Sequence, residues 1–273
     1  MKQIAFWKMS GSGNDFVVID NRDKKIAGGL PKLAMALCHR QFGVGADGLL
    51  LLEPSAKADF RMVYFNSDGS RASMCGNGAR CLAWVAHEKG VVDGRFTFET
   101  DAGLVKGYVE DRVVEITLSD AVDYRPQFAL TVGGRPWKLS YINTGVPHAV
   151  IEVPDVAKID LMKWGKLFRF HRAFGPKGTN VNFIERTGAH SLTVRTYERG
   201  VEGETLACGT GVSACAIAAA LRGRVSPKVR CKTTGGDVLE VGFALHADDP
   251  KHPATQVTLK GPVRRTFVGE AAV

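Results

Sequence analysis

The chain has 273 residues, of which 45% are hydrophobic and 23% charged, so it is expected to fold as one large globular domain or two ordinary ones. No stretch has the length and apolarity of a membrane span or a signal peptide, which favours a cytoplasmic protein without membrane contact. The net charge of +8 comes from scattered Lys and Arg, and this argues against a nucleic-acid partner.

Short β-branched and aromatic runs bounded by Gly, Asp and Asn predict strands, and Ala- and Leu-rich runs predict helices. In the first half the expected strands are 16–20, 48–53, 60–65, 96–100, 107–110 and 113–118, and the expected helices are 31–40 and 79–90. In the second half the expected strands are 148–153, 180–185, 192–198, 237–245 and 256–259, and the expected helices are 161–171 and 212–224. The last helix is apolar all round, which predicts complete burial.

The two halves repeat one sequence pattern. Matching segments lie 132 residues apart (145 minus 13), and the offset becomes 133 beyond residue 53. The matches are 13–20 with 145–152, 39–43 with 171–175, Tyr64 with Tyr197, and Cys75 with Cys208. So regular an offset indicates a duplicated domain.

The duplication predicts an α+β fold of two pseudo-symmetric lobes. Each lobe is expected to be a strongly curved, mostly antiparallel sheet or barrel around a central helix. The N-terminal lobe is expected to span 1–126, together with a C-terminal strand at about 261–273, and to carry Cys75. The C-terminal lobe is expected to span 127–260 and to carry Cys208. The active site is then expected in the cleft between the lobes.

The cysteines direct attention to thiol chemistry. A chain without export signals keeps its thiols reduced, and no pair of its six cysteines has the spacing of a zinc site. Four of them (38, 81, 215 and 231) are expected to pack as small buried hydrophobes. Cys75 and Cys208 differ, because each occurs in a Cys-Gly-x-Gly turn that opens a helix.

Such a turn presents unpaired backbone N–H groups and the positive end of the helix dipole, which favour a thiolate and bind a carboxylate. Two equivalent turns would place two thiols on opposite sides of one substrate carbon. Inversion of a tetrahedral carbon needs that arrangement, because one group removes a proton from one face and the other delivers a proton to the opposite face. Cys75 and Cys208 are therefore the predicted acid and base of an amino-acid epimerase.

At these residues the sequence resembles the diaminopimelate epimerase family. The motifs MSGSGNDFVVID, FNSDGSRASMCGNGARC and YERGVEGETLACGTG resemble its N-terminal motif and its two cysteine signatures. NTGVPHAV and GTNVNF resemble two further segments, so that the likeness runs from residue 9 to about residue 215. Asn77 stands where relatives that racemise proline have histidine, which favours the diaminopimelate branch.

The resemblance implies conversion of LL- to meso-2,6-diaminopimelate, a step of lysine and cell-wall precursor synthesis, by an isomerase that acts as a homodimer without pyridoxal phosphate or metal. It assigns the acid–base pair to Cys75 and Cys208. It implies substrate contacts by Asn14, Asn66, Gly76, Asn77, Asn180, Glu198, Arg199, Gly209 and Thr210. It places His148 and Glu198 where the family has groups that tune the thiols.

Two positions depart from the family pattern. Val146 replaces an asparagine common in the Gly-x-Pro-His motif, and Gly48 replaces a glutamine found in many members. Both positions border the substrate in the family, so a racemase or epimerase of another amino acid is the first alternative. A nucleic-acid-binding protein would need clustered Lys and Arg, and a thiol redox protein would need a nearby resolving cysteine; the sequence shows neither.

Overall fold

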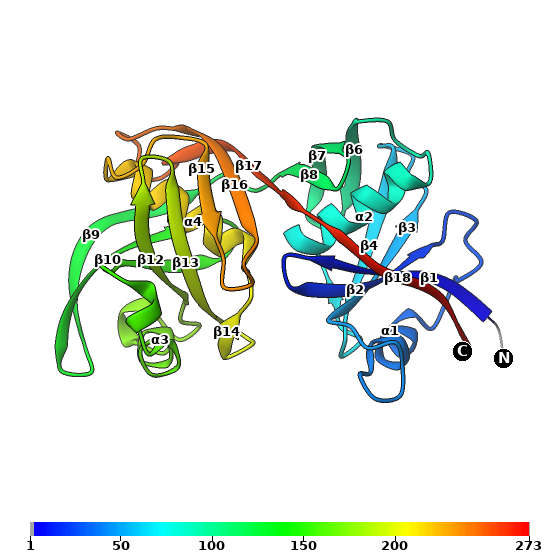
Figure 1. The fold of residues 1–273 in the computed structure, drawn as a ribbon, viewed down its shortest axis with the longest axis horizontal. Coiled ribbons are helices and arrows are strands. Elements are labelled where there is room, and N and C mark those ends of the chain that lie inside the picture. Colours follow the sequence, from blue (N-terminus) through cyan, green and yellow to red (C-terminus); the bar gives the residue numbers. More distant parts are fainter. Residues whose placement is uncertain (1–2, 273) are drawn as a thin grey trace. The chain divides into compact units, whose positions relative to one another are not determined.

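The computed structural model describes residues 3–272, and these form two compact units (Figure 1). The first unit ends at Ile116 and resumes at Gly261, and the second unit runs from Thr117 to Lys260. The boundary drawn at residue 126 falls inside strand β9 (Val122–Val132), all of which lies in the second unit. Pro126 does not interrupt this strand, because the pairing of β9 with β10 shifts register around it and such an irregularity tolerates proline.

The first unit contains one mixed sheet. Neighbouring strands are antiparallel except in the pairs β2/β3 and β4/β6, which are parallel. Short β5 (Arg71–Ala72) is antiparallel to β4. The strand order is β18 (Arg264–Ala272), β1 (Gln3–Gly11), β2 (Asn14–Asp20), β3 (Gly48–Glu53), β4 (Phe60–Asn66), β6 (Arg95–Thr100), β7 (Gly103–Glu110) and β8 (Val113–Thr117).

The second unit repeats this order and these directions. Its parallel pairs are β11/β12 and β13/β15, and short β14 (Gly203–Thr205) lies beside β13 in the place of β5. The other pairs are antiparallel. The strand order is β9, β10 (Arg135–Asn143), β11 (Pro147–Glu152), β12 (Asn180–Gly188), β13 (Ser191–Glu198), β15 (Val229–Lys232), β16 (Val238–Leu245) and β17 (Ala254–Pro262). The predicted fold class, two pseudo-symmetric α+β lobes from a duplication, is confirmed.

Strand register corrects one detail of the sequence comparison. Leu50 pairs with Tyr64 in the first unit, and Asn182 pairs with Thr196 in the second. The offset is therefore still 132 in β4 and β13, so Tyr64 corresponds to Thr196 and not to Tyr197. The offset becomes 133 only in the turns that follow these strands, where an extra residue is tolerated because turns lie at the surface.

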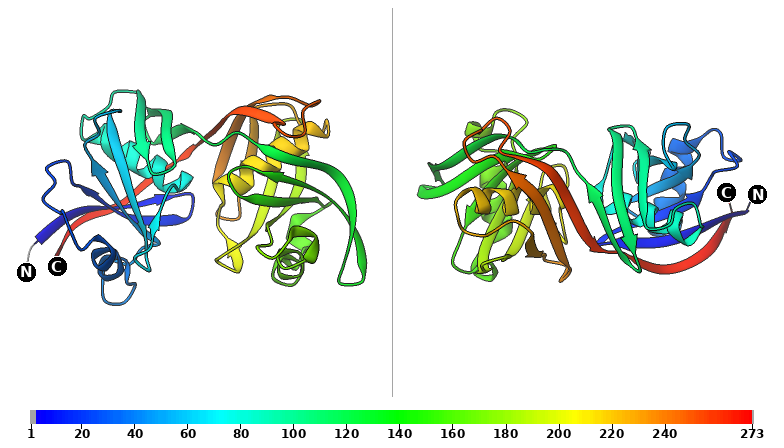
Figure 2. Two further views of the ribbon diagram at one scale, coloured as in Figure 1. Left: turned by 180° about the vertical axis from the view of Figure 1, so that it is seen from behind. Right: turned by 90° about the horizontal axis from the view of Figure 1, so that it is seen from above.

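Two helices in each unit connect parallel strands. Helices α1 (Leu30–Cys38) and α3 (Leu161–Arg169) lie in the connections of the first parallel pairs. Helices α2 (Gly76–Glu88) and α4 (Gly209–Leu221) lie in the connections of the second pairs. Figure 1 and the rotated views of Figure 2 show α2 and α4 lying against the strands of their own units.

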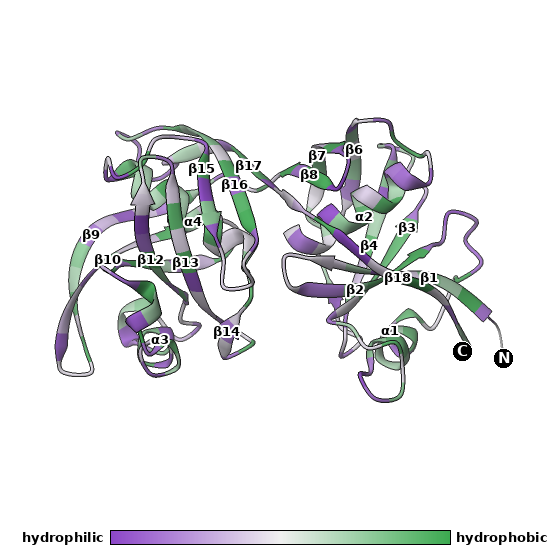
Figure 3. Cartoon of the chain, in the orientation of Figure 1, coloured by the Kyte–Doolittle hydropathy of each residue, from purple (hydrophilic) through white to green (hydrophobic). Residues whose placement is uncertain are grey.

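Helix α4 is the centre of the second core. Its residues from 211 to 220 are all buried, as its uniformly apolar sequence predicts. In the first unit, β3 is buried along its whole length, which Figure 3 shows as a hydrophobic strand. A strand covered on both faces has a continuous apolar run, and this explains why GLLLLE does not alternate.

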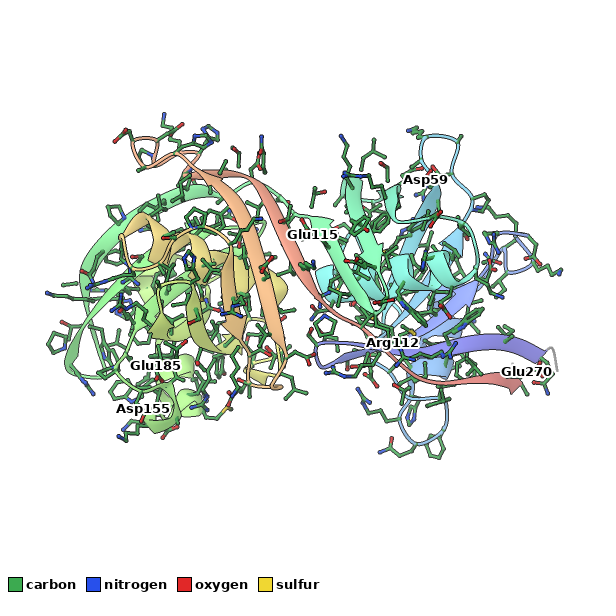
Figure 4. All side chains as sticks on the ribbon, turned by 45° about the horizontal axis from the view of Figure 1, so that its top comes forward. Asp59, Arg112, Glu115, Asp155, Glu185 and Glu270 are labelled. Carbon is green, nitrogen blue, oxygen red and sulfur yellow. The ribbon has the colours of Figure 1, made fainter. Side chains whose placement is uncertain are left out.

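The connection before α3 is fixed by side chains to the sheet. It contains the 3₁₀ helix η1 (Val156–Lys158), whose first residue donates its N–H to Glu185 Oε2 on β12 at 3.1 Å. Asp155 caps η1 by accepting the N–H of Ala157, and Figure 4 labels both Asp155 and Glu185 in this part of the second unit. A second 3₁₀ helix, η2 (Arg172–Phe174), follows α3.

Replacing Ile217 by alanine tests how much the second core depends on α4. Ile217 is fully buried, so Ile217→Ala is expected to lower the free energy of unfolding by about 2–5 kcal/mol. The matched control Val201→Ala alters a side chain that is 59% exposed, and a shift within about 0.5 kcal/mol is expected. Urea unfolding measures both, and equal shifts would contradict the assignment of α4 to the core.

Candidate functional site

Cys75 and Cys208 occupy the same structural position in the two units. Each is the N-cap residue of its helix and has extended backbone angles, with φ −144° and ψ 118° at Cys75 and φ −117° and ψ 110° at Cys208. The carbonyl of each accepts the first helical hydrogen bond at 2.8 Å, from Ala79 and Val212 respectively. Neither cysteine side chain caps its own helix. The N–H groups of a first helical turn can bind an anion, and here they belong to residues that directly follow the cysteine.

The second glycine of each turn is required by close packing. A Cβ atom at Gly211 would lie 2.6 Å from Asn182 Oδ1 and 3.3 Å from the sulfur of Cys208. A Cβ atom at Gly78 would lie 3.2 Å from the ring of Phe16. These glycines let each helix start approach the sheet, which brings the thiol next to side chains on neighbouring strands.

In the second unit a chain of hydrogen bonds leads from the sheet to the thiol. Asn182 Nδ2 lies 3.2 Å from His148 Nδ1, and His148 Nε2 lies 3.1 Å from Thr210 Oγ1. Thr210 Oγ1 in turn lies 3.5 Å from the sulfur of Cys208. His148 is completely buried, and desolvation followed by the positive charge of Arg199 lowers its pKa to about 3.

The partners of Asn182 determine the tautomer of His148. Asn182 Nδ2 also donates to the carbonyl of Ala149 at 3.0 Å, so the amide nitrogen must face Nδ1 of the imidazole. Thr196 Oγ1 donates to Asn182 Oδ1 at 2.9 Å and holds the amide in this orientation. Neutral His148 therefore accepts at Nδ1 and donates from Nε2 to Thr210, whose hydroxyl can donate to the sulfur of Cys208.

The first unit has a different set of side chains around its helix start. Asn77 Nδ2 donates to Asn14 Oδ1 at 2.7 Å, and Asn14 Nδ2 donates to Asp47 Oδ2 at 3.0 Å. Asp47 also ties in the turn after Asn66, because its carbonyl accepts the N–H of Ser67 at 3.0 Å. The predicted substrate residues of this unit are thus gathered around Asp47.

The structure explains how Gly48 is accommodated. A Cβ atom at Gly48 would lie 2.6 Å from the ring of Tyr64, so the tyrosine fills the space that a side chain at position 48 would need. The hydroxyl of Tyr64 donates to Asn66 Oδ1 at 2.7 Å, and Asn66 Nδ2 donates to Ser70 Oγ at 3.0 Å. Tyr64 therefore orients Asn66.

Asn180 connects two backbone segments of the second unit that carry predicted site residues. Its Oδ1 accepts the N–H of Arg199 at 2.8 Å, and its Nδ2 donates to the carbonyl of Pro147 at 3.0 Å. Asn180 pairs with His148 across the parallel strands β11 and β12. Glu198 ends β13 immediately before Arg199, and the half-buried Val146 precedes Pro147. Through these contacts Asn180 connects Arg199 to the segment that contains Val146 and His148.

The other cysteines are unsuited to acid–base work. Cys38, Cys81, Cys215 and Cys231 are free and buried. Burial raises the pKa of Cys81 and of Cys231 to about 12, so these thiols stay protonated at neutral pH. Within residues 3–272, no three His, Cys, Asp or Glu side chains come together to form a metal site. None of the helices in that range is long and apolar enough to span a membrane.

Comparison with known proteins identifies the family. A family model described as "Diaminopimelate epimerase" matches residues 6–120 and 140–263. The chain belongs to the diaminopimelate epimerase family. Among its relatives, the diaminopimelate epimerase of Aquifex aeolicus is 45% identical over 277 residues, which cover 97% of each chain. That of Chlorobaculum tepidum is 41% identical and covers 96% of this chain and 98% of the relative. The resemblance inferred from the motifs is confirmed.

Solved structures share the fold of this diaminopimelate epimerase family member at low sequence identity. A phenazine biosynthesis protein of the PhzF family from Bacillus anthracis has a TM-score of 0.76 at 15% identity, with both chains covered completely. A probable proline racemase from Agrobacterium radiobacter K84 has a TM-score of 0.73 at 19% identity, covering 99% of this chain and 93% of the other. At these identities the likeness confirms the fold alone.

Sequence reasoning missed three residues that contact the predicted site. Asn182, Arg80 and Asp47 all hydrogen-bond to predicted site residues. Asn182 and Arg80 lie inside the quoted motifs, and Asp47 immediately precedes Gly48. A polar residue at a position expected to be buried could have pointed to two of these residues from the sequence alone. Asn182 lies within the buried strand NVNFIE, and Arg80 lies in the first turns of a buried helix.

The buried neutral state of His148 predicts a pH dependence of stability. Its pKa is lowered in the folded protein, so below pH 6.5 the unfolded chain binds a proton that the folded protein refuses. Stability should therefore fall as the pH drops from about 6 to 4, by up to about 1.4 kcal/mol per pH unit from this group. Urea unfolding of His148→Gln should show a shallower fall than the wild type.

The matched control for this prediction is His190→Gln, which changes an exposed histidine of the same unit. Its pH dependence should follow that of the wild type. If His148→Gln loses stability as steeply as the wild type over this range, the neutral assignment of His148 is wrong.

Proposed function

We propose that the chain converts LL-2,6-diaminopimelate to the meso isomer by two-base proton transfer, with Cys75 and Cys208 as the acid–base pair. The observation that carries the proposal is the equivalent position of the two thiols, each the N-cap of a buried helix in one of two duplicated units. Membership of the diaminopimelate epimerase family supports this substrate and the role in lysine synthesis.

The proposed reaction begins with one cysteine as thiolate and the other as thiol. The thiolate removes the proton from the α-carbon, and the electron pair left behind delocalises into the adjacent carboxylate. The thiol on the opposite face then gives its proton to the α-carbon, which inverts the configuration and leaves the two cysteines in exchanged protonation states. The protein's own side chains supply both the acid and the base, so no organic cofactor is required.

The helix starts would stabilise the charge that develops during the reaction. The backbone N–H groups of Gly76-Asn77 and of Gly209-Thr210 lie beside the thiols and can donate to the reacting carboxylate. They are held in place before the reaction begins. The negative charge therefore forms where donors already point, and this lowers the barrier more than donors that must reorganise.

The remainder of the substrate would be held by polar residues near the ends of β4 and β13. Arg199 can bind the distal carboxylate in a bidentate manner, and Glu198 can accept from the distal ammonium group. Asn180 supports this role, because it fixes the backbone at Arg199. Asn66, oriented by Tyr64, offers a further amide from the first unit.

We also propose that the protein is a cytoplasmic homodimer. The support is a set of exposed apolar side chains on the first unit. Phe42 (89% exposed) and Phe267 (45% exposed) form a patch beside one pocket, and Val268 (60% exposed) points to the other face of β18. Phe267 and Val268 lie on β18, for which β1 is the partner strand in the first unit. A second copy that covers the patch and β18 would remove apolar surface from water.

The epimerase proposal is tested by following the α-hydrogen of LL-diaminopimelate by proton NMR in deuterium oxide, with reduced protein and no added cofactor. The wild type is expected to exchange this hydrogen and to form the meso isomer. Cys75→Ala and Cys208→Ala should each lower inversion by several orders of magnitude, because each lacks one of the two groups. Cys231→Ala, a control at a buried thiol outside the site, should keep the wild-type rate.

Two outcomes would overturn parts of this proposal. Inversion by either single variant at near the wild-type rate would eliminate the two-thiol mechanism. A wild type that exchanges nothing would eliminate the substrate, and other amino acids would then be tested, since Val146 and Gly48 depart from the family pattern.

The homodimer is tested by sedimentation of Val268→Lys. A lysine on β18 should oppose burial of this strand, and the sedimenting mass should shift from dimer toward monomer at low concentration. The control Val238→Lys changes a strand residue of the second unit that is 48% exposed, and it should sediment as the wild type does. A wild type that sediments as a monomer would contradict the proposal.

A further inference from the structure

A polarised chain of hydrogen bonds runs through the predicted site residues of the first unit, which we call the first half-site. Arg80 Nη2 donates to Asn77 Oδ1 at 3.0 Å, and Asn77 Nδ2 donates to Asn14 Oδ1 at 2.7 Å. Asn14 Nδ2 then donates to Asp47 Oδ2 at 3.0 Å. The chain begins at a cation, passes through two amides and ends at a carboxylate.

The charged ends determine which way both amides point. A guanidinium group only donates hydrogen bonds, and an ionised carboxylate only accepts them. Asn77 must therefore turn its oxygen to Arg80, and Asn14 must turn its nitrogen to Asp47. Reversing either amide would place two donors or two acceptors against each other in a partly buried chain of hydrogen bonds, which is costly.

Both ends of the chain are fixed in place. Arg80 is completely buried and also donates to Ser12 Oγ at 3.0 Å. Asp47 accepts from Arg40 Nη2 at 2.7 Å and from the backbone N–H of Asp15 at 3.3 Å. Asn77, in the first turn of α2, is 3% exposed, so the chain connects the helix start to the loop before β3.

The polarity of the chain restricts what Asn14 can offer to a ligand. Its carbonyl oxygen already accepts from Asn77, and one of its two amide hydrogens already points to Asp47. Asn14 is half-buried, and its second amide hydrogen is the donor that it can offer. A carboxylate oxygen accepts such a bond, whereas an ammonium group cannot.

We infer that Arg80 and Asp47 are positioning residues that make Asn14 a hydrogen-bond donor toward a carboxylate of the substrate. This inference rests on the proposed function for the identity of the substrate. It adds that the first half-site favours a carboxylate at Asn14, because the amide hydrogen that the chain leaves over is a donor. Neither Arg80 nor Asp47 needs to contact the substrate to exert this selection.

The second unit does not repeat this chain. Val146 occupies the position equivalent to Asn14 and Ser213 the position equivalent to Arg80, where its hydroxyl donates to the carbonyl of Gly209 at 3.0 Å. The carboxylate selection by a side-chain amide is therefore specific to the first half-site, although the helix starts are duplicated.

Asp47→Asn tests the polarity directly. Asparagine keeps the shape of the side chain but can offer a donor to Asn14, so the orientation of Asn14 is no longer fixed. The KM for diaminopimelate should rise about tenfold or more while kcat stays within about threefold, because a hydrogen bond of ground-state binding is lost. The matched control Asp20→Asn removes a carboxylate on β2 that pairs with Arg22, outside the chain, and should leave KM unchanged.

The exchange variant, Asn14→Asp combined with Asp47→Asn, separates selection from structural support. The amide introduced at position 47 can donate to the carboxylate introduced at position 14. The contact between positions 14 and 47 is therefore restored with reversed polarity, and the net charge is unchanged. A carboxylate at position 14 has no N–H to donate, however, so KM should stay at least about tenfold raised. A return to the wild-type KM would show that Asn14 has only a structural role and would overturn the inference.

Arg80→Met removes the cation at the other end and should raise KM as Asp47→Asn does. Because Arg80 is completely buried, its replacement can prevent folding. The KM of this variant is therefore compared with the wild type only if the variant unfolds cooperatively in urea. If Arg80→Met does not fold, Asp47→Asn and the exchange variant test the inference on their own. Unchanged KM values in a folded Arg80→Met and in Asp47→Asn would overturn it.

A second measurement is independent of epimerase activity. Cys75 would be alkylated with iodoacetate, which carries a carboxylate, and with iodoacetamide, which does not, and the modified cysteine would be quantified by mass spectrometry. The ratio of the two rates at Cys75 should fall several-fold in Asp47→Asn and in the exchange variant, and should not fall in Asp20→Asn. An unchanged ratio would overturn the inference even if the wild type proves inactive on diaminopimelate, and a lowered ratio would support it in that case.

Discussion

The site depends on one constraint, that a helix begins at a cysteine and presents the backbone N–H groups of its first turn beside the sulfur. Gly78 and Gly211 make this possible. A Cβ atom at Gly78 would press on Phe16, and one at Gly211 would press on Asn182 and on the cysteine of the turn itself. The duplicated strand order in each unit places the helix start against the same sheet positions. The thiol and the anion-binding N–H groups are thus positioned by one local structure, which occurs twice.

The two units surround this common structure with different side chains. In the second unit, neutral His148 donates toward Thr210 and is oriented by Asn182. In the first unit, Phe16 and Leu50 take the positions of His148 and Asn182. The polar side chains there are the amides of Asn77 and Asn14, whose orientation is set by Arg80 and Asp47. A duplicated backbone therefore supports two chemically distinct half-sites. Such a difference suits a substrate that has to be bound in one orientation.

Sequence alone predicted the duplication, the helix starts and the family, because these follow from spacing and from the Cys-Gly-x-Gly turns. It missed β1, β9, β10 and β15, whose mixed or partly exposed residues give a weak strand pattern. It also missed Asn182, because a buried polar residue becomes informative only when its partners are known. The orientation of an amide depends on groups distant in sequence, as Asp47 and Asn14 show, and no local pattern encodes it.

The most direct test of the two-thiol account is the position of the label at low conversion, when LL-diaminopimelate is incubated with the enzyme in deuterium oxide and both isomers are separated for mass spectrometry. With two bases, the proton removed on one face is not the one delivered on the other. The account therefore predicts deuterium at the inverted carbon of the meso product and protium in the remaining LL substrate. Protium retained in the product would mean that a single base carries the proton across, and it would contradict the account.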